Sequence, residues 1–241
     1  MKKTVSLLLI LILSLTMCAT ATAADGDAPL EAFKAPAAGS SVKSAMVTVL
    51  DTASATEATV MPEGADSEYD PLVDYAKQMI AAATTGDYEA GYAAEEARNA
   101  KIAEQGLDYP EIKFDDFMLI AKIIWAEAGS EWLDDEWKMC VGEVVLNRVA
   151  SPEFPDTVKE VLEQPGQYYG ANSRYFSSII PTERCAVAAM RLFNGERVIN
   201  DPSVVFQANF RQGGGVHTAC YDKYLGWTYF CYSRNTSLYE Q

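Results

Sequence analysis

Residues 123–149 read IIWAEAGSEWLDDEWKMCVGEVVLNRV, and this stretch decides the fold. Apolar residues recur at helical spacing at both of its ends, and an acidic, Gly-containing segment separates them. We expect one helix from about Phe114 to Ala128 and a second from about Asp134 to Val149. The domain around these helices should be mostly helical.

A glutamate, Glu127, ends the first apolar stripe. Ile120, Ile123 and Ile124 precede it by seven, four and three residues, so a helix places all four on one side. Burial among apolar side chains disfavours the charged carboxylate and raises its pKa, as a general acid requires near neutral pH. Glu127 is therefore either a catalytic acid or the last residue of a surface helix at the edge of the core.

The first 23 residues have the pattern of a signal peptide. Lys2 and Lys3 precede an apolar run over residues 5–15, and an A-x-A pattern ends at Ala23. The run is too short for a stable membrane span, so we expect a secreted protein that does not insert into the membrane after cleavage. Cys18 offers an alternative lipid anchor, which Met17 disfavours.

The chain is acidic, with 34 Asp and Glu against 19 Lys and Arg. It contains no basic run, so we expect no nucleic acid and no anionic membrane among its partners. Four cysteines follow the signal peptide: Cys140, Cys185, Cys220 and Cys231. An even number in an exported chain permits disulfides, and we expect Cys220 to pair with Cys231 across a hairpin, with Cys140 and Cys185 as buried thiols.

Two segments precede the compact region. Residues 24–70 are rich in Ala, Ser, Thr, Asp and Glu, which predicts a disordered linker. Residues 71–106 predict a helical hairpin that turns at Gly86, with Asp87 as the cap of its second helix. We interpret this hairpin as a spacer or docking element.

Residues 111–241 are long enough for one domain. Asp156 is expected to cap a short helix and Thr182 a longer one that ends near Gly195. Alternation at residues 203–210 and 228–233 predicts two strands, with a Gly-rich connection after the first. The predicted class is α+β, mostly α, with a small C-terminal β-hairpin.

Counting residue types excludes several chemistries. His217 is the only histidine, so the chain has no HExxH motif and no His-rich zinc site, and we expect neither metal nor organic cofactor. We place His217 in an exposed loop. Cleavage of a glycosidic bond by a carboxylic acid fits what is left, because aromatic groups would hold the sugars. The candidate aromatics are Tyr168, Tyr169, Tyr175, Phe206, Tyr221, Tyr224, Trp227 and Tyr229.

Several blocks then carry a resemblance: AKIIWAEAGSE, VGEVVLNRVASPEFPDTVKEVLEQPGQY, PTERCAVAAMRLFNGE, VVFQANFRQGGG and TYFCYS. In this order they resemble the SleB-type cell wall hydrolase family, whose founding members degrade spore cortex peptidoglycan. The resemblance covers residues 115–236. The family's first block usually reads E-A-R-G-E, whereas this chain has E-A-G-S-E at 127–131.

The resemblance implies a fold similar to lysozyme-like lytic transglycosylases and a catalytic acid at Glu127. One glutamate then protonates the bond between N-acetylmuramic acid and N-acetylglucosamine and acts as base while the muramyl 6-hydroxyl closes a 1,6-anhydro ring. Hydrolysis by a muramidase and an inactive wall-binding module are the alternatives. The substrate would be the glycan strands of the wall or of spore cortex during germination.

Six further residues are candidates for substrate binding: Glu131, Gln167, Tyr168, Phe206, Gln207 and Tyr229. Gln207 either holds an N-acetyl group or, as a strand amide more often does, bonds a neighbouring residue. Glu131 is alternatively a solvated acid at a helix end. Arg148 is predicted to brace the packing through an ion pair, and Glu143 to lie on the surface.

Overall fold

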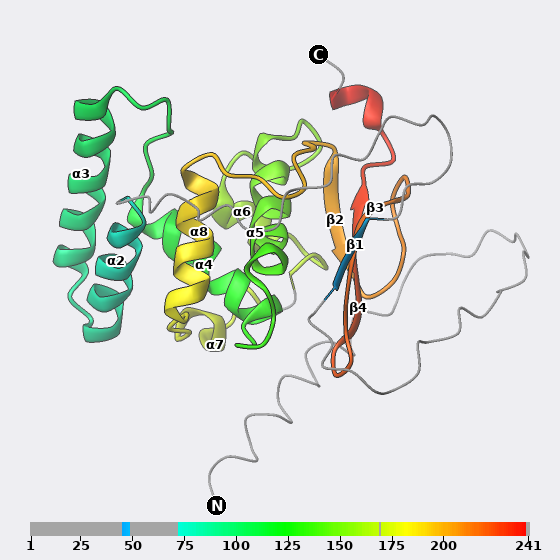
Figure 1. Cartoon of the computed structure of the whole chain (residues 1–241), viewed down its shortest axis with the longest axis horizontal. Coiled ribbons are helices and arrows are strands. Elements are labelled where there is room, and N and C mark those ends of the chain that lie inside the picture. Colours follow the sequence, from blue (N-terminus) through cyan, green and yellow to red (C-terminus); the bar gives the residue numbers. More distant parts are fainter. Residues whose placement is uncertain (1–44, 49–71, 169, 240–241) are drawn as a thin grey trace, which may run out of the picture.

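The computed structural model describes residues 45–48, 72–168 and 170–239 of the chain (Figure 1). The predicted signal peptide, Cys18 and all of the predicted linker except residues 45–48 lie outside these residues. The described elements, in chain order, are β1 (Ala45–Thr48), α2 (Val73–Thr85), α3 (Tyr88–Gln105), α4 (Phe114–Ala128), α5 (Asp135–Ala150), α6 (Val158–Glu163), α7 (Arg174–Ser177), α8 (Glu183–Phe193), β2 (Val204–Ala208), β3 (Val216–Asp222), β4 (Gly226–Tyr232) and the 3-10 helix η1 (Thr236–Tyr239).

Polar side chains start the helices where the sequence places them. Asp87, Asp134 and Thr182 each accept a hydrogen bond from the backbone N–H three residues later, which confirms the predicted starts of α3, α5 and α8. The predicted cap of α6 was wrong by one residue: Thr157, and not Asp156, accepts the N–H of Glu160. The helices α4 and α5 have nearly the predicted bounds, although α4 begins after Lys113 without a side-chain cap.

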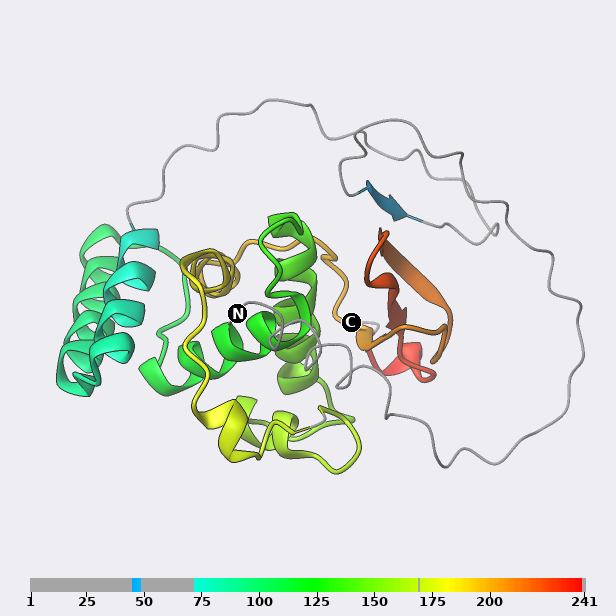
Figure 2. The ribbon, with the colours of Figure 1, turned by 90° about the horizontal axis from the view of Figure 1, so that it is seen from below.

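The helices α4, α5 and α8 enclose the main core. Ile120, Ile123 and Ile124 of α4 are buried. Apolar residues of α5 are buried as well: Trp137, Cys140, Val141, Val144 and Val145. Gly142 of α5 allows a close approach here, because a Cβ atom would come 2.5 Å from Cδ1 of Leu192 on α8. The three helices thus form one packed layer beside the sheet, as Figure 1 and Figure 2 both show.

The helical hairpin of α2 and α3 packs on the far side of α8 (Figure 1). Ala76 and Met79 of α2 are fully buried and belong to the same apolar cluster as α4 and α5. Arg98 of α3 is also fully buried, and its Nη2 donates to Oδ1 of Asn194 at 2.7 Å. The hairpin therefore shares the core of the compact domain, and its role as a spacer or docking element stays a prediction.

An antiparallel sheet covers the other side of the helices, with the strand order β1-β3-β4-β2. The strands β2 and β4 match the two predicted strands, whereas β3 was missed because the Gly-rich segment before it was read as the whole connection. The described part of the predicted linker, β1, pairs with β3 at the sheet edge. A mostly helical fold with a small antiparallel sheet is confirmed; the lysozyme-like fold stays a prediction.

The four described cysteines are buried free thiols, so the predicted pair of Cys220 and Cys231 is wrong. In the ladder, Cys220 lies opposite Thr228, three residues before Cys231 on the neighbouring strand. An odd separation along a strand puts the two side chains on opposite faces of the sheet. Among the described helices, none is both long enough and apolar enough to cross a membrane.

Candidate active site

Glu127 lies in the last turn of α4, at the border between the helical core and solvent. Its side chain is exposed, while Ile120, Ile123 and Ile124 beneath it are buried. The prediction that the carboxylate continues the buried stripe is therefore wrong: Ala128, four residues after Ile124, takes that place. The Glu127 residue is thus partly open to solvent, while protein atoms around its carboxyl group desolvate that group.

The surrounding protein nevertheless changes the acidity of this carboxyl. Desolvation by burial raises the pKa of Glu127, which confirms the expected direction, and a hydrogen bond from Gln207 opposes it. The Gln207 Nε2 donates to Oε2 of Glu127 at 3.3 Å. This is the single hydrogen bond of the Glu127 carboxyl within the described part of the chain, so one oxygen is left for a substrate.

The helix α5 binds residues 198–200, which precede the strand that carries Gln207. Glu143 was predicted on the surface, but it is fully buried and its carboxylate accepts three backbone N–H bonds, from Val198 at 2.8 Å, Ile199 at 3.0 Å and Asn200 at 2.7 Å. The reason for the error is tertiary: residues 198–200 run across α5 and bring their N–H groups to Glu143. Buried N–H groups require such acceptors.

One turn further along α5, two side chains fix the start of β2. Asn147 Nδ2 donates to the carbonyls of Asp201 and Val204, and Arg148 Nε donates to the carbonyl of Val205 at 2.6 Å. Arg148 was predicted to form an ion pair; its guanidinium instead lies over aromatic rings, at 4.9 Å from the centroid of Phe154. These bonds set the position of β2 relative to α4, and hence that of Gln207.

Tyr168 lies close enough to Glu127 for its hydroxyl to feel the charge of the carboxylate, and we refer to Glu127, Tyr168 and Gln207 together as the Glu127 cleft. Burial raises the pKa of the Tyr168 hydroxyl, the charge of Arg148 lowers it and the charge of Glu127 raises it. The Arg148 guanidinium lies 5.0 Å from the centroid of the Tyr168 ring. The structure thus brings together three of the predicted site residues, Glu127, Tyr168 and Gln207, from three distant parts of the sequence.

Three buried polar atoms around this cleft have no hydrogen-bond partner among the described residues. They are the Tyr168 hydroxyl, Oε1 of Gln207 and Nη1 of Arg148. An unpaired buried polar atom costs about 1–3 kcal/mol, and such atoms are rare in native proteins. Polar groups of a substrate would supply the missing partners.

The other four candidates lie elsewhere. Glu131 is exposed, 4.0 Å from Nη1 of Arg184 at the start of α8, as a solvated acid. Gln167 is half-buried, and its recorded hydrogen bond is that of its backbone N–H to the carbonyl of Gln164. Neither contacts Glu127.

Phe206 and Tyr229 pack against other aromatic rings. Phe206 packs edge-on against Phe154, with ring centroids 6.3 Å apart. Tyr229 stacks on Trp227 at 5.8 Å and lies opposite Ala208, the residue after Gln207. Because neighbouring residues of a strand point to opposite faces, Tyr229 lies on the face opposite to Gln207. The structure therefore does not bring Tyr229 to Glu127.

His217 is half-buried in β3 and not in an exposed loop as predicted. Burial lowers the pKa of its imidazole, and the charges of Asp201 and Glu143 raise it. No cluster of three or more His, Cys, Asp or Glu suited to a metal ion occurs in the described ranges.

The domain is mostly helical, and it places a carboxyl group of raised pKa beside the side-chain amide of a strand residue. This arrangement suits catalysis by a carboxylic acid. A family model described as Cell Wall Hydrolase matches residues 134–212, about a third of the chain. This match supports a cell wall hydrolase domain with peptidoglycan as substrate. It includes Glu143, Asn147, Arg148, Tyr168 and Gln207, and it begins after Glu127. No curated protein and no solved structure matches the chain.

Proposed function

We propose that this protein is an exported enzyme that cleaves the glycosidic bond between N-acetylmuramic acid and N-acetylglucosamine in peptidoglycan, with Glu127 as its acid and base. The observation that carries the proposal is the state of the Glu127 carboxyl: desolvation raises its pKa, and Gln207 binds one of its oxygens. A protonated carboxyl near neutral pH is what general acid catalysis requires.

In the first step, the protonated Glu127 gives its proton to the glycosidic oxygen as the bond to the muramyl C1 breaks. In the second, the Glu127 carboxylate removes the proton of the muramyl 6-hydroxyl, whose oxygen bonds to C1 and leaves a 1,6-anhydro end. Attack by water instead would give a reducing end and make the enzyme a muramidase. A retaining glycosidase uses a second carboxylate as nucleophile, which the route to the 1,6-anhydro end does not need.

Substrate contacts follow from the unpaired atoms. Oε1 of Gln207 accepts a hydrogen bond from the N–H of an acetamido group, while its Nε2 holds Glu127. The Tyr168 hydroxyl, buried and without a partner in the described ranges, bonds a sugar oxygen. Both contacts would orient the bond to be cleaved toward the carboxyl.

The experiment compares the mature protein with its Glu127→Gln variant on peptidoglycan sacculi, and identifies the released fragments by mass spectrometry. General acid catalysis contributes about 10²–10⁴-fold, so the variant should lose at least about a hundredfold in rate. The matched control is Glu96→Gln, because Glu96 is an exposed glutamate of α3 far along the chain from the cleft. Fragments with 1,6-anhydro ends support the transglycosylase; reducing ends support the muramidase.

A non-catalytic wall-binding module is the second candidate. It is favoured by the position of the family match, which begins at residue 134 and leaves Glu127 outside it. If the native protein and both variants bind sacculi equally and release no fragments, the enzyme proposal is wrong and the binding module is the better description.

A further inference from the structure

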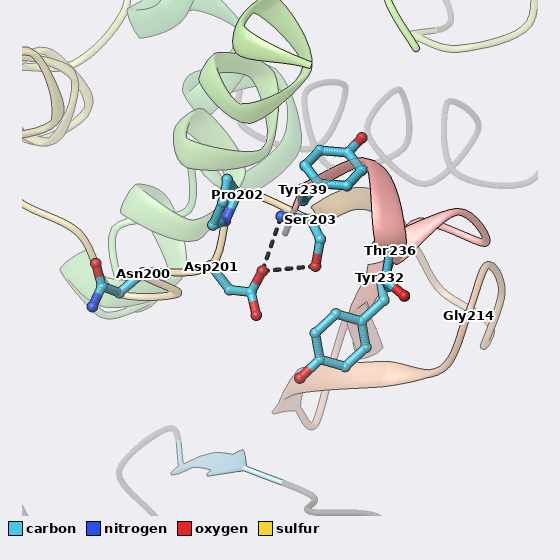
Figure 3. Close-up of a pocket in the computed structure, with 8 residues that line it drawn as sticks. All are labelled: Asn200, Asp201, Pro202, Ser203, Gly214, Tyr232, Thr236 and Tyr239. Carbon is cyan, nitrogen blue, oxygen red and sulfur yellow. Dashed lines mark hydrogen bonds between the residues drawn. The ribbon is translucent and has the colours of Figure 1, made fainter. Parts of the chain in front are cut away.

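A pocket of about 460 Å³ lies at the other end of β2 from Gln207 (Figure 3). Glu127, Tyr168 and Gln207 are not among its lining residues. Its lining residues are Asn200, Asp201, Pro202, Ser203, Gly214, Tyr232, Thr236 and Tyr239.

Asp201 supplies the only carboxyl side chain among the lining residues. Its Oδ1 accepts hydrogen bonds from the N–H of Ser203 at 2.9 Å and from the Ser203 hydroxyl at 2.7 Å. Its Oδ2 accepts no recorded bond, and no Lys or Arg of the described residues lies within 4.0 Å of it. One carboxylate oxygen is therefore held in place and the other faces the pocket without a counter-ion.

Aromatic rings form the walls around this carboxylate. Figure 3 shows the Tyr232 ring across the pocket from Asp201 and the Tyr239 ring on another side. His217 packs edge-on behind Tyr232, with centroids 5.4 Å apart. The Tyr239 hydroxyl donates to Oε2 of Glu153 at 2.8 Å. The walls are therefore fixed before any ligand binds.

Glu153 differs from Asp201 in having its charge fully engaged. Besides Tyr239, it accepts hydrogen bonds from Asn235 Nδ2 at 2.6 Å and from the Ser233 hydroxyl. The hydrogen bond from Ser233 is the main reason that the pKa of Glu153 is lowered. Glu153 thus anchors the wall, and Asp201 is the group left for a ligand.

A carboxylate beside aromatic rings selects a cation. A primary ammonium gains charge-assisted hydrogen bonds from the carboxylate and a cation–π interaction from a ring within about 6 Å. An anion or an apolar group would leave the free oxygen of Asp201 without a partner. The chemistry of the pocket is that of an alkylammonium site.

The pocket and the cleft lie along one strand. Gln207 follows Ser203 by four positions, which corresponds to about 13 Å at the usual rise of a strand. A branched substrate with a glycan strand at Glu127 can reach the pocket with a peptide branch. The peptide branches of peptidoglycan carry a diamino acid whose free amine is protonated at neutral pH.

We propose that the Asp201 pocket binds the side-chain ammonium of the peptide branch of peptidoglycan, while the Glu127 cleft holds the glycan. This inference rests on the proposed function and names the part of the substrate that selects it. Binding of one molecule at both sites fixes which glycosidic bond lies at Glu127.

The test measures binding of a soluble peptide, N-acetyl-L-Ala-γ-D-Glu-L-Lys, by titration calorimetry to the full mature chain. The same peptide acetylated on its lysine Nε is the first comparison. A charged hydrogen bond is worth about 1.5–3 kcal/mol, so acetylation should weaken binding about tenfold or more. Asp201→Asn should weaken binding of the free-amine peptide by the same factor, because it keeps Oδ1 for Ser203 and removes the charge.

The control is Asp108→Asn, which removes an exposed charge away from the pocket and should leave the affinity unchanged. D-glucosamine serves as a third probe: equal binding of this amine would assign the site to deacetylated sugars instead of the peptide. Equal affinity for the two peptides, or no binding of either, would overturn the proposal, and this comparison needs no variant.

The two proposals fail in different ways. Loss of cleavage in every form, with the amine-dependent peptide binding intact, would refute the enzyme and keep the pocket. Cleavage by the native chain without any effect of lysine acetylation would refute the pocket and keep the enzyme.

Discussion

Glu127 on α4 and Glu143 on α5 are glutamates on neighbouring helices, but the surroundings of their carboxyl groups differ completely. Glu143 is buried and accepts three backbone N–H bonds. Glu127 is exposed, accepts one side-chain bond, and its pKa is raised by desolvation. The carboxylate of Glu143 is therefore engaged in structural hydrogen bonds, whereas that of Glu127 has an oxygen available to a substrate.

This difference between the two glutamates explains how Gln207 comes to lie beside Glu127. The charge of Glu143 is satisfied by the segment before β2, and this contact delivers Gln207 to Glu127. A structural carboxylate therefore positions the partner of the candidate catalytic one.

The largest expected effect on stability is that of Glu143→Ala. One buried and two partly buried N–H groups would lose their acceptor, so the free energy of unfolding should fall by about 1–3 kcal/mol, mainly through the buried N–H of Ile199. Urea denaturation measures this, with Glu96→Ala as a surface control that should stay within about 0.5 kcal/mol. A loss below about 1 kcal/mol would mean that residues 198–200 do not depend on Glu143.

The contact between Glu127 and Gln207 is tested by Gln207→Ala. The hydrogen bond from Gln207 lowers the pKa of Glu127, so its loss should raise that pKa further. The rate of wall cleavage, which requires the protonated acid, should then decline at a higher pH than in the native protein. An unchanged pH profile would show that the bond does not set the acidity of Glu127.

A smaller effect concerns Glu127 and stability. Desolvation raises the pKa of Glu127 in the folded state above its value in the unfolded state. The contribution of Glu127 to the free energy of unfolding is therefore fully present below the unfolded-state pKa and is lost as pH rises through the folded-state pKa. Glu127→Gln, which has no charge to desolvate, should therefore gain stability relative to the native protein between acidic and neutral pH. Thermal unfolding at several pH values measures the gain, and a constant difference across pH would contradict it.

The smallest expected effect is that of a reducing agent. The described cysteines are free, and burial raises the pKa of the Cys220 thiol to about 12. Reduction should leave the melting temperature unchanged, and a thiol reagent should react only after unfolding. A reduction-dependent shift would indicate a disulfide.

Much of the helical framework was predictable because its determinants are local. The stripes of α4 and α5 and the caps Asp87, Asp134 and Thr182 act within a few residues. Glu127 was found as a candidate because it stood at the end of such a stripe, although its exposure was predicted wrongly.

Contacts between distant residues were not predictable. The burial of Glu143 depends on a segment 55 residues away, and the bond between Gln207 and Glu127 spans 80 residues. The missed strand β3 is formed by its pairing with β4, and that register also separates Cys220 from Cys231. The spacing of Glu143 and Asn147, four residues apart on α5, was the available signal for a shared face.

The sequence by itself determined the longer helices, the starts of α3, α5 and α8, and the residue types available for chemistry, since backbone propensity and capping depend on neighbours along the chain. The tertiary structure alone decided which carboxylate is engaged and which is free. That choice depends on which N–H groups and which solvent reach each oxygen, and folding sets both by bringing residues 198–207 against α4 and α5.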